Sequence, residues 1–180
     1  MTSFPALKPN ASRSPLPPWE HLPILAFPLR GQVMAVPLAA VVKLVNCPVS
    51  LQTDENEVGL LPWGDHQITV LNLYTRLATS SEAATSPRRP FLLILQAPHQ
   101  DLYGIPVTEP PALLNLPASS IRPLPQAYRQ AMPLPLASYV AVLPRGEISV
   151  TLLLLDLSLL LHHFLGAGQD QVALVSGKHH

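Results

Sequence analysis

The chain has 180 residues, the length of one domain or two small subdomains. Its net charge is zero, which argues against a nucleic-acid-binding protein, since such a protein needs a basic stripe. Hydrophobic residues make up 48% of the chain, enough to form a core, so the chain is not disordered as a whole. Charged residues are only 12%, which predicts a surface that rests against partners, and 22 prolines argue against long helices.

The first 21 residues are rich in proline and serine and show no hydrophobic period, so we expect a flexible arm there. This arm lacks the apolar segment of a signal peptide. The longest apolar run, residues 151–165, is interrupted by Asp156 and falls short of the roughly 20 residues of a membrane span. Together with the single cysteine, Cys47, these features predict a cytoplasmic protein with no direct membrane insertion.

Short apolar segments separated by turns make up the first half of the predicted domain. Trp63-Gly64-Asp65 is typical of a hairpin turn, because glycine tolerates the positive φ needed there, and the strand after it alternates apolar and polar residues. Asn72 is placed to cap a short helix over residues 73–77. The polar stretch 50–57 is a predicted loop. The strands predicted in this half are residues 24–29, 33–38, 41–45, 58–62 and 67–70.

Residues 79–90 are polar, small and flanked by proline, which indicates a linker between two halves at about 22–78 and 91–165. In the second half, residues 121–125 are extended because residues before proline avoid the helical region. Residues 156–165 form a predicted short closing helix, and residues 166–180 a flexible tail. The strands predicted here are residues 91–95, 102–107, 138–144 and 149–152.

The two halves carry a weak internal repeat. Residues 61–70 align without a gap to residues 143–152, and residues 35–38 resemble residues 104–107. Such similarity indicates two alike halves, although any two hairpins in a leucine-rich chain look similar. Many short strands at this spacing favour an all-β fold, with two small barrels that fit the two halves.

The sequence offers very little catalytic or metal-binding chemistry. Cys47 has no histidine or basic cluster beside it to lower the pKa of its thiol, so a buried structural thiol is the better interpretation. The histidines stand alone, or are adjacent in the chain, and do not form a metal site. No nucleophile elbow and no glycine-rich phosphate cradle are present. We therefore expect no enzyme, no cofactor and no metal, and attention falls on surface residues.

The order of segments resembles the CheW-like adaptor family of bacterial chemosensory systems. Residues 27–45 are similar to the family's opening strands, residues 58–77 to its central hairpin and short helix, and residues 102–125 to a segment that ends in an Ile-Arg-Pro-like turn. Leu155-Asp156-Leu157 resembles the closing segment before its last helix. The resemblance runs from about residue 22 to residue 165.

This resemblance implies two intertwined, SH3-like, five-stranded β-barrels with a few short helices. It also implies a non-catalytic adaptor that bridges the cytoplasmic tip of a chemoreceptor and the regulatory domain of a histidine kinase. The receptor tip would lie between the barrels, and the barrel-end turns would meet the kinase. The residues expected to make those contacts are Pro62, Trp63, Gly64, Arg145 and Gly146.

One departure from the family pattern falls on these residues. Typical members carry Asn-Leu-Arg-Gly at the central hairpin, whereas this chain keeps the glycine, Gly64, and has Trp63 in place of the arginine. The change implies a divergent adaptor or a partner with a more apolar face. We interpret Trp63 as a partner contact at the hairpin tip, outside the core; the alternative is that it folds back over the barrel mouth. The alternative function is a generic β-barrel protein-interaction module in another assembly.

Overall fold

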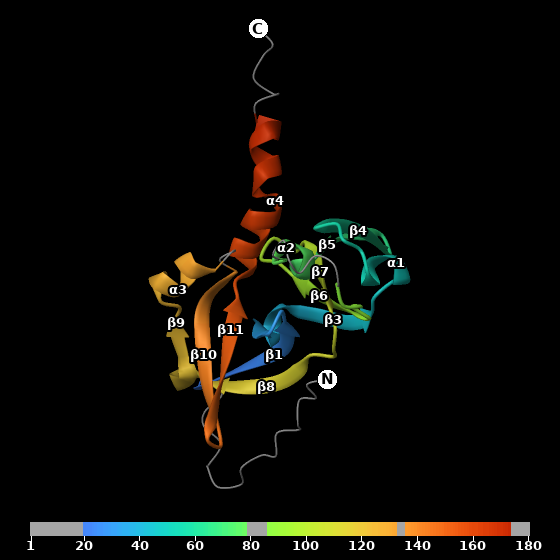
Figure 1. Cartoon of the computed structure of the whole chain (residues 1–180). Helices are drawn as coiled ribbons and strands as arrows, with labels where there is room; N and C mark the ends of the chain where they lie inside the picture. The colour runs from blue at the N-terminus through green and yellow to red at the C-terminus, as the bar shows by residue number, and fades with distance from the viewer. Residues whose placement is uncertain (1–19, 79–85, 133–135, 174–180) are drawn as a thin grey trace.

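The computed structural model describes residues 20–78, 86–132 and 136–173, and these form two antiparallel-rich sheets with short helices between them (Figure 1). The first sheet has the strand order β8-β1-β2-β11-β10-β9, with bounds Ala112–Pro117, His21–Leu29, Gln32–Pro37, Ile148–Leu155, Ala137–Arg145 and Ile121–Pro123. The second has the order β3-β6-β7-β5-β4, with bounds Val41–Asn46, Phe91–Gln96, Leu102–Val107, His66–Leu71 and Val58–Trp63. The helices are α1 Val49–Gln52, α2 Leu73–Arg76, α3 Gln126–Ala131 and α4 Leu157–Ala173, with 3-10 turns η2 Leu38–Ala40 and η3 Ala118–Ser120.

The two sheets repeat one pattern of strand pairing. From β8 to β10, and again from β3 to β4, successive pairs are antiparallel, antiparallel, parallel and antiparallel. The repeated hairpins β4–β5 and β10–β11 occupy the same place in this order. The first sheet carries one strand more than the five expected, the three-residue β9.

Each sheet draws strands from both halves of the sequence. β3 of the first half pairs with β6 of the second, and β8 of the second half pairs with β1 of the first. The simple picture of one barrel for each sequence half is therefore wrong, and the intertwined arrangement that the resemblance implied is observed.

Three apolar clusters follow from the alternation of side chains along these strands. In β6, Leu92 and Ile94 point into a cluster made by the second sheet, whereas Leu93 and Leu95 point into a larger cluster shared by both sheets. In β1, Ile24 faces a cluster of the first sheet alone. Strands buried on both faces lack apolar–polar alternation, which explains the continuous apolar runs in the sequence. The shared cluster holds the two sheets together.

Several local predictions are confirmed. In β5, Ile68 and Val70 are buried while Gln67 is exposed. The side chain of Asn72 caps α2, because its oxygen accepts a hydrogen bond from the Thr75 amide at 3.2 Å. Gly64 and the other turn glycines have positive φ, as a two-residue hairpin turn requires.

Other local predictions need correction. The helix expected over residues 156–165 continues to Ala173, through the first part of the predicted tail, and α1 lies inside the predicted loop 50–57. β8 and α3 were not predicted, because prolines flank both segments. Residues 1–19 of the predicted arm and residues 174–180 of the tail lie outside the described residues; His21, assigned to the arm, begins β1.

The predicted linker 79–90 is also more than a spacer. Residues 79–85 lie outside the described part, but residues 86–90 do not, and Arg89 among them is fully buried. Arg89 donates a hydrogen bond to the Asp54 carbonyl oxygen at 2.7 Å. A segment with polar composition thus contributes a buried contact, which composition alone could not reveal.

Candidate functional site

The β4–β5 turn holds three of the five predicted contact residues. Trp63 is the last residue of β4 and pairs with His66, so the turn proper is Gly64-Asp65. Gly64 has φ +57, and a Cβ at this position would meet no heavy atom within 4 Å. Pro62 and Gly64 are exposed. The backbone therefore presents these two residues to solvent at the end of the second sheet.

The prediction that Trp63 lies exposed at the hairpin tip is wrong. Trp63 is half-buried and packs against the apolar cluster of the second sheet. The buried members of that cluster are Cys47, Ile68, Val70, Leu92 and Ile94. The interpretation of Trp63 as a residue outside the core is corrected, because its side chain packs against this cluster while part of the residue remains exposed.

The β10–β11 turn holds the other two predicted residues. Arg145 pairs with Ile148 across the hairpin, and Gly146 follows with φ +62. Arg145 is half-buried, whereas Gly146 and Ile148 are exposed. The two turns thus share their backbone conformation and differ in the side chain before the glycine.

The structure keeps the two turns apart. β4 and β5 belong to the second sheet and β10 and β11 to the first. In Figure 1 the β10–β11 hairpin reaches the lower end of the molecule, while β4 and β5 lie at the upper right. The predicted contact residues therefore form two separate surfaces, one at the end of each sheet.

Cys47 belongs to the apolar cluster that Trp63 packs against, and the buried Arg89 lies near it. Burial raises the pKa of the Cys47 thiol, and the nearby Arg89 guanidinium lowers it by less. Burial likewise lowers the pKa of Arg89, partly offset by Cys47 and Asp54. A thiol held protonated is a poor nucleophile. This arrangement fits the prediction that Cys47 is a structural thiol.

The sequence analysis did not single out the exposed aromatic and basic residues in and near β9. Tyr128 in α3 is 62% exposed and Tyr139 in β10 is 50% exposed. Arg122 and Arg129 are exposed in the same region. Tyrosine and arginine are enriched at protein–protein interfaces. A sequence signal for this basic region was available, because residues 110–146 contain arginines but no aspartate or glutamate.

The described ranges contain neither a metal-binding cluster nor a membrane-spanning helix. No group of three or more histidine, cysteine, aspartate or glutamate residues there could hold a metal ion. No helix within those ranges is both long enough and apolar enough to cross a membrane.

Comparison with known proteins identifies the family. A family model described as CheW-like domain matches residues 23–164, which is most of the chain. The chain belongs to the CheW-like domain family. Among curated proteins, none matches it. Among solved structures, the scaffolding protein TtCheW from Thermoanaerobacter tengcongensis is similar, with a TM-score of 0.58 and 13% identity over 75% of this chain and 88% of that one.

The match to a CheW fold confirms the all-β class with SH3-like barrel subdomains. It also confirms the resemblance that was based on segment order. CheW-like domains are domains of scaffold adaptors in chemosensory systems, and the predicted contact turns of this member lie at the ends of its two sheets. Trp63 thus packs partly against the core, at the position where the resemblance expects the family's usual arginine.

Proposed function

We propose that this protein is a non-catalytic, cytoplasmic chemosensory adaptor that bridges the regulatory domain of a histidine kinase and the cytoplasmic tip of a chemoreceptor. The observation that carries the proposal is the CheW-like family match over residues 23–164. The two-sheet fold is consistent with it, since each barrel offers an end for a partner.

The five predicted contact residues have distinct roles in this proposal. The two turns lie at the ends of different sheets, so we assign them to different partners instead of both to the kinase. Pro62, Trp63 and Gly64 contact one partner through the end of the second sheet, and Arg145 and Gly146 contact another through the end of the first. Exposure of Pro62, Gly64 and Gly146 supports these contacts. Because the two surfaces are separate, both partners can bind at once, as a bridge requires.

The replacement of the usual arginine by Trp63 sets the expected chemistry of the first contact. A half-exposed indole favours an apolar pocket on the partner, whereas an arginine favours a carboxylate. Trp63→Arg is therefore expected to weaken binding to this protein's own partner. A matched control is Leu113→Ala, which truncates an apolar side chain that is 62% exposed on β8 and outside both contact surfaces.

The test uses purified full-length protein and calorimetric titration against the kinase regulatory domain and the receptor tip of the same organism. We expect Trp63→Ala or Arg145→Ala to weaken the binding of one partner at least tenfold, and Leu113→Ala to leave the binding of both partners unchanged. Binding of the wild-type protein to neither partner would reject the proposal in favour of an interaction module in another assembly.

A further inference from the structure

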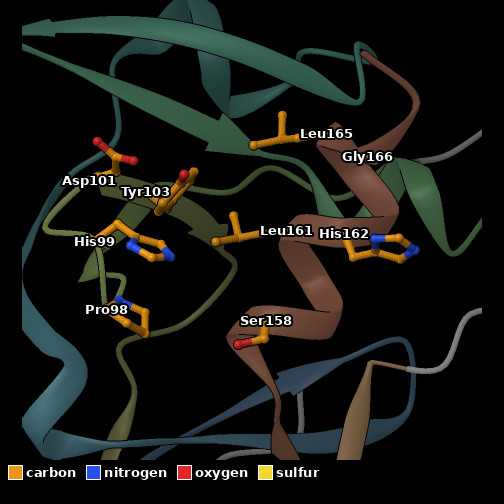
Figure 2. A pocket seen from close by; sticks show the side chains of 9 residues that line it. All are labelled: Pro98, His99, Asp101, Tyr103, Ser158, Leu161, His162, Leu165 and Gly166. Carbon is orange, nitrogen blue, oxygen red and sulfur yellow. The ribbon is translucent and has the colours of Figure 1, made fainter. Parts of the chain in front are cut away.

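A cleft of about 300 Å³ lies between the β6–β7 turn and the first half of α4 (Figure 2). Asp101, Tyr103 and His99 form one wall, and Leu161 and Leu165 point toward them from α4. This volume is at the lower end of the range for small-ligand sites. The cleft is separate from both contact turns, which belong to other hairpins.

The wall opposite α4 carries polar groups that the protein itself does not use. Among the described residues, none forms a hydrogen bond or ion pair with the Asp101 carboxylate, the Tyr103 hydroxyl or the His99 ring. Tyr103 is only 8% exposed as a residue, and it lines the cleft. Asp101 is the one aspartate, glutamate, lysine or arginine among the nine lining residues. The cleft therefore has a single negative charge beside an unpartnered hydroxyl.

The backbone of the turn holds these groups in an unusual conformation. Gln100 has a backbone φ of +69, a value that residues other than glycine rarely adopt. Two hydrogen bonds fix the turn: the Gln100 amide donates to the Ala97 carbonyl oxygen at 2.9 Å, and the Ala97 amide donates to the Asp101 carbonyl oxygen at 3.0 Å. Strained backbone of this kind is concentrated at functional sites.

We propose that this cleft binds an alkyl cation, a guanidinium or ammonium group on an aliphatic stem. The Asp101 carboxylate pairs with the positive group, and the Tyr103 hydroxyl and a His99 ring nitrogen accept further hydrogen bonds from it. Leu161 and Leu165 cover the aliphatic stem. Burial and the neighbouring Asp101 carboxylate both raise the pKa of Tyr103, so the hydroxyl stays neutral near pH 7. The site needs neither the kinase nor the receptor, and so goes beyond the proposed function.

The first test uses n-butylguanidinium as the probe and its neutral analogue n-butylurea as the comparison. Two-dimensional amide spectra of the full-length protein should show saturable shifts in residues 97–103 and 158–166 with the cation only. Asp101→Asn keeps the shape and removes the charge, and should weaken binding at least tenfold. The matched control, Asp65→Asn, removes an exposed charge from the β4–β5 turn and should change nothing.

A second variant and a second probe complete the test. Tyr103→Phe should weaken the binding of n-butylguanidinium several-fold, while the amide spectrum of the variant stays that of a folded protein. An alanine-based helical peptide with one arginine distinguishes the source of the ligand: tighter binding than n-butylguanidinium indicates a side chain of a partner protein, and weaker binding indicates a free small molecule. Equal binding of n-butylurea, or equal affinity in Asp101→Asn and the wild type, would overturn the proposal.

Discussion

Replacement of Trp63 by alanine tests how this residue divides its role between core and surface. The indole packs against the cluster of the second sheet but is not fully buried. Truncation of a fully buried tryptophan costs about 3–5 kcal/mol, so Trp63, which keeps a minor part of its surface exposed, is expected to cost about 2–4 kcal/mol. A purely exposed residue would cost less than about 0.5 kcal/mol.

Urea denaturation followed by far-UV circular dichroism measures this cost. The control is Leu60→Ala in the same strand, since Leu60 is 61% exposed and belongs to none of the three clusters. We expect the control to change the free energy of unfolding by less than about 0.5 kcal/mol. Trp63→Phe should recover part of the stability lost in Trp63→Ala, because a ring still covers the cluster. If Trp63→Ala and Leu60→Ala have the same small effect, the packing of Trp63 described above is wrong.

Three further predictions concern the interior. Gly104→Ala should destabilise the fold by about 1–3 kcal/mol in urea denaturation, because a Cβ there would lie 2.9 Å from Leu92 Cδ1; an unchanged midpoint would contradict the close packing of β7 on β6. Asn72→Ala should cost about 1–3 kcal/mol, because the α2 cap is lost together with the 2.6 Å hydrogen bond to the Asp54 carbonyl oxygen; a cost below 0.5 kcal/mol would refute the importance of the cap. Since burial raises the pKa of Cys47, the folded state holds its thiol proton at higher pH than the unfolded state, so stability should fall as pH rises through the alkaline range; Cys47→Ala should flatten that fall, and an unchanged slope would count against a raised pKa.

Local sequence signals predicted local structure well. Asn72 before an apolar segment predicted the α2 cap, and glycine at position 64 predicted a tight turn. Alternation in residues 67–70 predicted which side chains of β5 are buried. In each case neighbouring residues alone determine the feature, through backbone conformation or a short-range hydrogen bond.

Long-range pairing was not accessible in the same way. Nothing within residues 41–46 indicates that β3 pairs with β6 of the other half, because strand partners are chosen by packing across the whole domain. The burial of Arg89 in a polar segment depends on the distant Asp54 carbonyl oxygen. The half-burial of Trp63 depends on Cys47, Ile68 and Leu92. The predicted contact residues thus lie in the predicted turns or at the strand ends beside them, while their partition between core and surface required the structure.

The bridging role is tested most directly by co-sedimentation of the histidine kinase with membranes that contain the chemoreceptor, with and without this protein. We expect the kinase to sediment with the membranes only when the protein is added. Trp63→Ala or Arg145→Ala should reduce the amount bound, whereas Leu113→Ala should not. Kinase sedimentation that is independent of the protein, or absence of the protein from the pellet, would contradict it.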